Sequence, residues 1–406
     1  MAEDADRRLP GLDLLRALAI IWVMLYHLES VGPRLPGPLV GYGWMGVDLF
    51  FVLSGYLIGW QVLRPLTSGA RPAWWPWWQD FMLRRALRIL PAYLTVLALY
   101  LLLPAWGEVD HMRPAWQFLS FTINLLPGDL DQRAFSHAWS LCVEEHFYLL
   151  LPPVVWLLAR RPGLRKSVLL AIGVLLGGML LRAWLWQHEL VPVQGTVDYV
   201  ERFVALIYFP TPTRLDGLLA GTLLAALRAF RPGAWRALLA HGWLLLCVGL
   251  LGVAGVMWLM PGVPGFAGIV FGYPLLAWSF ACLLVACISG QTWPGRWRVP
   301  GLQLLATLAF CLYLTHKQVF HLVDGMLGDS LEGQPILAFG VYLGAALLAA
   351  GSLHMLVERP GLRWRDRLHK ACNKRNKRNK CNKCNTRSRD QLKQSGVPPD
   401  SIKTGS

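Results

Sequence analysis

Charged residues are scarce in this sequence: Asp, Glu, Lys and Arg make up only 16% of its 406 residues, whereas 55% are hydrophobic. A soluble domain of this length could not hide so much apolar surface, so an integral membrane protein is the default interpretation. The 20 Trp residues, many of them near the ends of apolar runs, fit the aromatic belts of membrane interfaces.

Acidic residues are fewer than basic ones, 24 against 39, and the net charge is +15. Residues 370–406 hold eleven Lys/Arg and only two Asp, and most of the remaining basic residues fall in loops between apolar runs. The net charge therefore does not indicate nucleic-acid binding, and we expect no nucleic-acid partner. Residues 361–406 are predicted to form a basic, low-complexity cytoplasmic tail without a packed structure.

The eight Cys residues do not form a disulfide framework, because five of them lie singly in apolar runs. In the tail, Cys381 and Cys384 form a CxxC without a second pair of ligands, so we predict no metal site. No small-residue cleavage site follows the first apolar run, which we interpret as a retained span after a short cytoplasmic segment, residues 1–10.

Apolar runs of about 20 residues predict an all-α, polytopic membrane bundle of about ten helices within residues 11–360. The predicted spans are 12–30, 43–63, 88–105, 138–158, 166–186, 206–227, 239–260, 266–288, 301–323 and 335–357. An even number places both termini on one side. The loops on that side hold 16 Lys/Arg and the opposite loops hold 4, which places both termini in the cytoplasm. The Trp-rich residues 73–78 are expected to lie on the inner membrane surface.

The first span carries Arg16 and His27 with ten residues between them. Eleven helical steps return to nearly the same face and cover roughly 16 Å. Arg16 is therefore expected near the cytoplasmic surface, and His27 in the outer third of the membrane.

Ionisable side chains inside other spans are functional-site hypotheses, because burying them in a membrane is costly. Glu144 and Glu145 lie at an estimated depth close to that of His27, and Ser140, Glu144 and Tyr148 share one helical face. Four further polar residues fall in the outer half of the membrane: Asp48, Arg214, Asp216 and His316. Such a cluster supplies what proton transfer needs, a base near neutral pH and a carboxylate that orients it. His137 and His146 are interpreted as rim or packing residues.

A second cluster is predicted at the inner face, where Arg84, Arg85 and Arg88 share a depth with Arg16. Guanidinium groups suit phosphate recognition, although each arginine alone also fits a membrane anchor or the positive-inside flank. An inner basic site and an outer His/carboxylate site together fit an enzyme that works across the membrane. They also fit a proton-coupled transporter or flippase of a lipid-linked or acylated sugar, although no paired Gly/Pro-broken helices are evident.

Six motifs occur in order: the Arg16/His27 pair, GVDLFFVLSGYLIG (46–59), RRALRILPAY (84–93), WSLCVEEHFYLLLP (139–152), TRLDGLLAG (213–221) and LYLTHKQV (312–319). Together they resemble the acyltransferase-3 family of integral-membrane acyltransferases over roughly residues 10 to 360. The resemblance implies a multi-pass enzyme of the bacterial inner membrane. Such an enzyme takes an acyl group, usually acetyl, from cytoplasmic acyl-CoA to a hydroxyl, commonly on a surface or exported carbohydrate.

Several residues match the family's motifs. Its first-span pair falls on Arg16 and His27, its RxxR element on Arg85 and Arg88, and its WSLxVEE element on Trp139, Ser140, Glu144 and Glu145. Cys142 and His146 replace the commoner Ser and Gln, and Gln318 stands where Pro is usual. These departures bear more on acceptor preference than on activity. No fused extracytoplasmic esterase-like domain is expected in this chain.

The resulting hypothesis assigns three groups of residues. Arg85, Arg88 and, as a further candidate, Arg16 bind acyl-CoA. His27 is the general base or an acyl carrier, oriented by Glu144 as first choice and by Glu145 or Asp48 next. The expected substrate contacts are Trp139, Ser140, Tyr148, Arg214, Asp216 and His316, with outer-loop residues Asp110, Asp129, Asp131, Trp186 and Glu189. A small molecule or a lipid head group is the weaker alternative to a carbohydrate acceptor.

Overall fold

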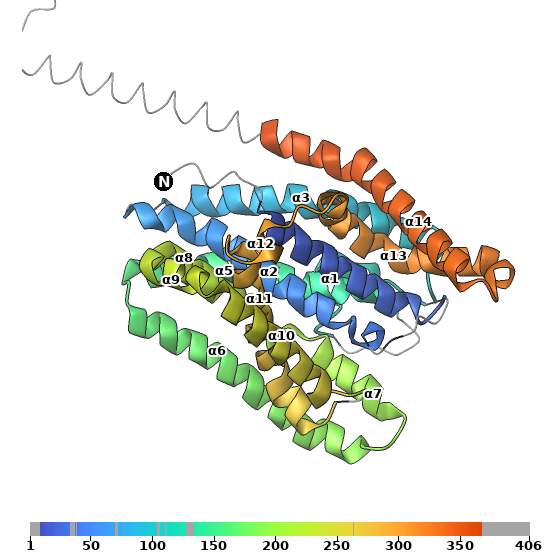
Figure 1. The fold of residues 1–406 in the computed structure, drawn as a ribbon, viewed down its shortest axis with the longest axis horizontal. Coiled ribbons are helices and arrows are strands. Elements are labelled where there is room, and N and C mark those ends of the chain that lie inside the picture. Colours follow the sequence, from blue (N-terminus) through green and yellow to red (C-terminus); the bar gives the residue numbers. More distant parts are fainter. Residues whose placement is uncertain are drawn as a thin grey trace, which may run out of the picture.

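The computed structural model describes residues 9–32, 37, 39–69, 72–103, 106–109, 111–126, 134–262 and 264–367. Within these ranges the chain forms helices and no strand (Figure 1). The α-helices are α1 (Pro10–Leu28), α2 (Met45–Leu63), α3 (Trp74–Leu102), α4 (Ala115–Leu119), α5 (Trp139–Arg160), α6 (Leu164–Leu185), α7 (Asp198–Phe203), α8 (Asp216–Phe230), α9 (Pro232–Ala240), α10 (Gly242–Leu259), α11 (Tyr273–Ile288), α12 (Trp293–Arg296), α13 (Leu302–Leu331) and α14 (Pro335–Leu353). Turns of π-helix adjoin several of them: η6 (Trp186–Leu190), η8 (Val204–Tyr208), η10 (Gly268–Gly272) and η11 (His354–Glu358).

Eight helical segments in the described ranges are long and apolar enough to cross a membrane, which confirms the predicted helical membrane bundle. They coincide with eight of the ten predicted spans. The other two ranges are also helical but differ in character. The range 206–227 ends within the 15-residue α8. The range 301–323 coincides with the first part of α13, whose middle carries the polar residues His316, Lys317 and Gln318. The count of ten spans and the cytoplasmic termini stay predictions.

The Trp-rich residues 73–78 do not form a separate surface element. Helix α3 begins at Trp74 and continues without a break to Leu102, so the predicted span, which starts at residue 88, coincides with the second half of a longer helix. At 29 residues the helix is about 43 Å long, which exceeds the ~30 Å thickness of a bilayer core. The first turn packs against α5, where the rings of Trp74 and Trp156 lie 5.2 Å apart.

Helices α1 and α2 occupy the middle of the bundle, and α6 and α14 lie on opposite sides of it (Figure 1). The described chain enters and leaves at one end of the bundle, because Leu9 and Leu362 line the same cavity. The helix that follows α14 continues to Arg367, beyond the predicted tail boundary at residue 361. Residues 368–406, with Cys381 and Cys384, lie outside the described ranges.

The most extensive helix contact joins α2 and α8, and it depends on glycine. A Cβ added to Gly221 would lie 2.1 Å from the Val52 carbonyl oxygen, and one added to Gly55 would lie 2.2 Å from the Leu218 carbonyl oxygen. Small residues let membrane helices approach in this way, because association in lipid depends on close packing. The contact fixes α8, and with it the residues just before α8, against α2.

We predict that Gly221→Ala lowers the thermal unfolding midpoint of the detergent-solubilised protein. The added methyl group must push α8 away from α2, and such overpacking costs about 1–3 kcal/mol. Gly173→Ala is the matched control, because no atom lies within 4 Å of a Cβ added to that α6 residue. Equal midpoints for the two variants would contradict the close approach of α2 and α8.

Candidate active site

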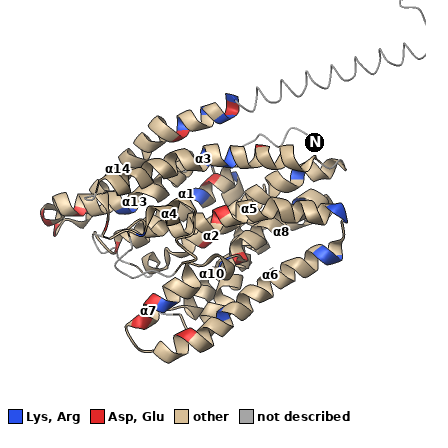
Figure 2. Ribbon diagram, turned by 180° about the vertical axis from the view of Figure 1, so that it is seen from behind, with Lys and Arg blue, Asp and Glu red and all other residues tan. Residues whose placement is uncertain are grey.

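A cavity of about 570 Å³ opens among α1, α2, α3, α5 and α13. Its wall carries six arginines and only three carboxylates. The arginines are Arg16, Arg84, Arg85, Arg88, Arg228 and Arg365, and the carboxylates are Asp13, Glu144 and Glu358. Figure 2 shows Lys and Arg gathered at one end of the bundle, with Asp and Glu inside it along α2 and α5. The cavity therefore offers a positively charged, confined space.

The structure brings the predicted inner cluster together, because Arg16, Arg85 and Arg88 all line this cavity. Arg16 lies 3.5 Å from the Asp13 carboxylate. Arg85 instead donates to the Gln61 side-chain oxygen at 3.1 Å, and within the described ranges neither Arg85 nor Arg88 has a carboxylate at ion-pair distance. An anion that enters the cavity can therefore bind these two guanidinium groups without displacing an ion pair.

The predicted face of α5 forms the inner wall of the cavity, because Ser140, Glu144 and Tyr148 all line it. Glu144 accepts hydrogen bonds from Ser54 Oγ at 2.8 Å and from Tyr148 Oη at 2.6 Å. Ser140 Oγ lies 2.6 Å from the hydroxyl oxygen of Tyr313 in α13. The carboxylate of Glu144 is thus fixed by two hydroxyl groups at the deep end of the cavity.

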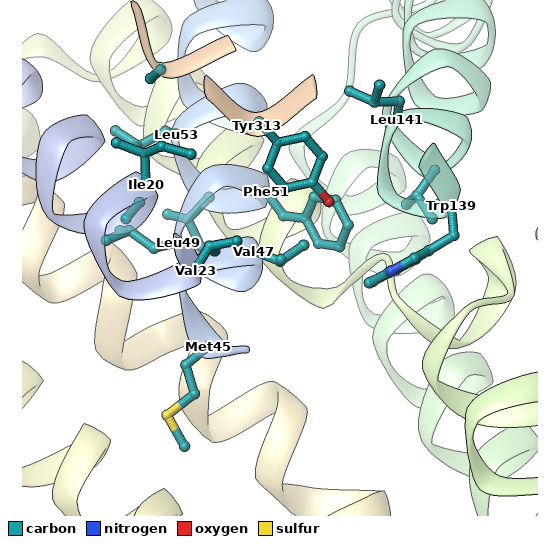
Figure 3. Close-up of a cluster of buried hydrophobic side chains, with 14 of the residues drawn as sticks. Ile20, Val23, Met45, Val47, Leu49, Phe51, Leu53, Trp139, Leu141 and Tyr313 are labelled. Carbon is teal, nitrogen blue, oxygen red and sulfur yellow. The ribbon is translucent and has the colours of Figure 1, made fainter. Parts of the chain in front are cut away.

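Tyr313 closes this end of the cavity. Figure 3 shows its ring beside Phe51 of α2, with Trp139 and Leu141 of α5 opposite its hydroxyl group. The hydroxyl also donates to the His137 carbonyl oxygen at 2.9 Å, and the Phe50 ring packs edge-on at 6.4 Å between centroids. Hydrogen bonds of the hydroxyl group and packing of the ring thus both fix the position of Tyr313.

His27 lies beyond Tyr313 and does not line the cavity. Its Nδ1 atom is 2.9 Å from Nε2 of His316, one helical turn along α13 from Tyr313. The ring centroids of Tyr313 and His316 are 5.9 Å apart, so a single side chain separates the cavity from the histidine pair. His137, which the sequence interpretation left out, stacks beside His316 at 5.4 Å.

The expected contact between His27 and a carboxylate is not found among the described residues. Glu144 faces Ser54 of α2, and Asp48 pairs with Arg214. Glu145 does not line the cavity, and its buried Oε1 atom has no hydrogen-bond partner in the described part of the chain. The expectation rested on depth along each helix, and depth does not reveal the direction in which a side chain points.

Two buried ion pairs account for the other predicted polar residues. Arg214 Nη2 lies 2.9 Å from both carboxylate oxygens of Asp48, and its guanidinium group stacks on the Tyr273 ring at 4.1 Å. Asp216 is bound by Arg182 through two hydrogen bonds of 2.7 and 3.1 Å. All four charged side chains are buried and none lines the cavity, so the geometry favours a structural role over the expected substrate contact.

Trp139 also lies in the core rather than at the cavity wall. Its ring stacks on Phe209 at 5.2 Å and packs against Phe51 at 6.0 Å. Among the outer-loop residues, Glu189 forms a half-exposed ion pair with Arg202 at 3.4 Å. Trp186 is buried beside Tyr199, with ring centroids 6.2 Å apart. The other three expected loop contacts, Asp110, Asp129 and Asp131, lie outside the described residues.

Four residues in and around the site were not predicted from the sequence, and two of them, Tyr313 and Arg182, could have been found from their positions in the apolar runs. Tyr313 stands three residues before His316 on one helix, a spacing that places both on the same side of α13. Ser54 lies in the 46–59 motif, but it is neither charged nor aromatic, so nothing in the sequence marks it as a site residue. Arg182 stands inside an apolar run, where burial of an arginine is costly and indicates a structural or functional role. Glu108, which pairs with Lys317 at 3.2 Å, lies in a loop and gave no such signal.

Cys311, His354 and Glu358 form a group whose ligand atoms lie within 4.8 Å of one another, close enough for a metal ion. Hydrogen bonds already connect them, since Glu358 Oε2 lies 2.7 Å from His354 Nδ1 and 3.2 Å from Cys311 Sγ. These bonds explain the proximity without a metal, and the surrounding cavity wall is rich in arginine, which disfavours a further cation.

These features define a class: a polytopic helical membrane protein with a cation-rich cavity and a histidine pair next to Tyr313 in the cavity wall. The family model described as an acyltransferase domain matches residues 9–355 of the chain. The chain therefore belongs to the acyltransferase-3 family, as the six sequence motifs indicated.

Two curated relatives of this chain are also named as acyltransferases. The chain is 29% identical over 236 residues to O-acetyltransferase OatA of Staphylococcus aureus strain NCTC 8325 / PS 47, a match covering 54% of this chain and 35% of OatA. It is 31% identical over 237 residues to the O-acetyltransferase candidate SACOL0978 of S. aureus strain COL, again covering 54% of this chain and 35% of the relative. The match thus spans about a third of the length of these relatives. No solved structure matches the chain.

The buried ion pairs provide a test of structural role against substrate contact. We predict that Asp216→Asn lowers the free energy of unfolding by about 3–5 kcal/mol, because Arg182 is left buried without its counter-charge. Glu189→Gln, which breaks the half-exposed pair with Arg202, should cost less than about 1 kcal/mol. The measurement is the thermal midpoint in detergent for both variants. An Asp216→Asn protein of normal stability that has lost activity would instead support the substrate contact.

Proposed function

We propose that this protein is a multi-pass acyltransferase of the bacterial cytoplasmic membrane. It moves an acyl group, acetyl as first choice, from cytoplasmic acyl-CoA to a hydroxyl group of an extracytoplasmic or lipid-linked carbohydrate. The observation that carries the proposal is the cavity, whose arginine-rich wall includes Tyr313, the ring neighbour of His316, which in turn contacts His27. The family and the names of the relatives support it.

In the proposed complex the phosphate groups of acyl-CoA lie against Arg85 and Arg88, with Arg16 nearby. Guanidinium groups form charge-assisted hydrogen bonds with phosphate oxygens, and the excess of cations in the cavity favours a polyanion. The volume of about 570 Å³ lies within the range of ordinary ligand pockets. The long pantetheine arm then carries the thioester past Glu144 towards Tyr313.

His27 is the proposed base. It takes the proton from the acceptor hydroxyl while the hydroxyl oxygen attacks the thioester carbonyl carbon. The carbon–sulfur bond breaks, and the CoA thiolate recovers the proton from the imidazolium of His27. In the covalent variant the imidazole attacks the thioester carbon first and the carbon–sulfur bond breaks, so that CoA leaves as its thiol. The acceptor hydroxyl then takes the acyl group from His27 and its proton passes to the released imidazole. For either route the proposal requires the Tyr313 ring to move aside, because this ring lies in the cavity wall next to His316, the partner of His27.

We predict that Arg85→Gln and Arg88→Gln raise the KM for acetyl-CoA about tenfold or more with little change in kcat. Each removes a charge-assisted hydrogen bond worth about 1.5–3 kcal/mol. The control is Arg359→Gln, because Arg359 is an exposed arginine outside the cavity. Normal kinetics in both cavity variants would show that these arginines serve only as membrane anchors.

We predict that His27→Gln lowers kcat about 10²–10⁴-fold, as expected for loss of a general base. The exposed His188 provides the control, and His188→Gln should remain active. Thermal midpoints of both variants exclude misfolding as the cause. Retained transfer in a folded His27→Gln protein would exclude His27 as the base or carrier.

The enzyme and transporter hypotheses differ in one product. Purified protein with acetyl-CoA and candidate glycans releases free CoA if it is an acyltransferase, whereas a sugar carrier releases none. Ping-pong kinetics, with labelling of the protein by radioactive acetyl-CoA in the absence of acceptor, would identify the covalent variant. Sequential kinetics without a labelled protein would identify direct transfer.

A further inference from the structure

His316 is fully buried, and both of its ring nitrogens have partners. Nδ1 lies 2.8 Å from the backbone carbonyl oxygen of Leu312, one turn earlier in α13. Nε2 lies 2.9 Å from Nδ1 of His27. The three groups form a short chain that runs from the helix backbone through one imidazole ring to the next.

The donors and acceptors in this row of hydrogen bonds follow from the Leu312 carbonyl oxygen at its start. A carbonyl oxygen can only accept, so Nδ1 of His316 carries the proton. A neutral imidazole has one N–H, which leaves Nε2 of His316 as an acceptor. Nδ1 of His27 must then donate to it, and the remaining nitrogen of His27, Nε2, holds a free lone pair.

This argument requires that His316 is neutral, and its surroundings favour that state. No carboxylate lies at ion-pair distance from His316 in the described ranges, and the nearby Glu108 carboxylate is already paired with Lys317 at 3.2 Å. A cation on a fully buried ring without a counter-charge is strongly disfavoured. The rings of Tyr313 and Phe320, each 5.9 Å away between centroids, hold the imidazole plane in place.

We propose that His316 is a positioning residue that holds His27 as its Nδ1–H tautomer, so that Nε2 of His27 is the basic and nucleophilic atom. The proposal rests on the proposed function, because it concerns the residue that performs the transfer. It replaces the expected orienting carboxylate with a neutral imidazole anchored to a backbone carbonyl. Hydrogen bonds of this kind select the reactive nitrogen of histidine in many sites.

The proposal also limits where the proton can go. The proton taken from the acceptor hydroxyl resides on Nε2 of His27 and returns from there to the thiolate of CoA. His316 does not pass it further, because its own Nδ1–H remains bonded to the Leu312 carbonyl group. His316 is thus placed behind His27 rather than in contact with the substrate, which changes the role that its motif suggested.

The kinetic test uses a matched pair of variants, His316→Gln and His316→Leu. The amide oxygen of Gln can reach the position of Nε2 and accept from His27, whereas Leu fills similar space without an acceptor. We expect His316→Leu to lower kcat about 10–100-fold, the usual effect of removing an outer-shell partner, with an unchanged KM for acetyl-CoA. His316→Gln should retain most of the activity. Equal losses in both variants, or full activity of His316→Leu, would overturn the proposal.

A spectroscopic measurement tests the tautomer without relying on activity. In protein labelled with ¹⁵N-histidine, the His27 signals are assigned by their loss in His27→Gln. We expect a protonated Nδ1 and an unprotonated Nε2 for His27 in the wild type, and a mixture of tautomers in His316→Leu. The opposite tautomer in the wild type would overturn the proposal.

The two levels of hypothesis fail in different ways. If the wild type releases no CoA with any acceptor, the proposed function fails, and the tautomer of His27 is still decided by its ¹⁵N spectrum. If His27→Gln is inactive but His316→Leu transfers acetyl groups at the wild-type rate, the proposed function stands and only the positioning role of His316 fails.

Discussion

A charged side chain inside an apolar bundle is costly unless an opposite charge or hydrogen-bond donors compensate it, and this constraint organises the structure. Asp48 of α2 binds Arg214, which stands two residues before α8, and Asp216 at the start of α8 binds Arg182 of α6. Arg214 also stacks on Tyr273 of α11. The N-terminal end of the short α8 is therefore connected to three other helices, and the glycine contact with α2 holds the rest of it. Removing one partner would leave an uncompensated charge in the core.

The cavity departs from this rule, and the departure is what marks it as a ligand site. Its six arginines face three carboxylates, and neither Arg85 nor Arg88 has an acidic partner at ion-pair distance among the described residues. Such an excess of charge is tolerable only where water or an anion can enter. The two kinds of arginine thus differ in purpose: Arg182 and Arg214 are neutralised within the protein, whereas Arg85 and Arg88 are available to a polyanionic ligand.

The apolar runs predicted the helical bundle and the approximate bounds of eight spans, because a bilayer imposes a minimum length of apolar helix. The helical period correctly placed Ser140, Glu144 and Tyr148 on one wall. The prediction of a carboxylate partner for His27 was wrong, because packing against other helices decides how each helix is rotated about its axis. Helix α1 packs on α13, which brings His27 to His316, while α5 turns Glu144 towards Ser54 of α2.

Tyr313 lies next to both parts of the proposed mechanism, the donor cavity and the histidine pair. Its hydroxyl group is held by Ser140 Oγ and the His137 carbonyl oxygen, and its ring separates the cavity from the histidine pair. A donor thioester that reaches His27 has to displace this ring and break the contact with Ser140. An empty or water-filled cavity supplies no binding energy for that displacement, so in the proposed mechanism His27 stays shielded from the cavity until the donor is bound. Such shielding would protect the thioester from hydrolysis, because the proposed base would meet the acyl group only after the arm of the donor has filled the passage.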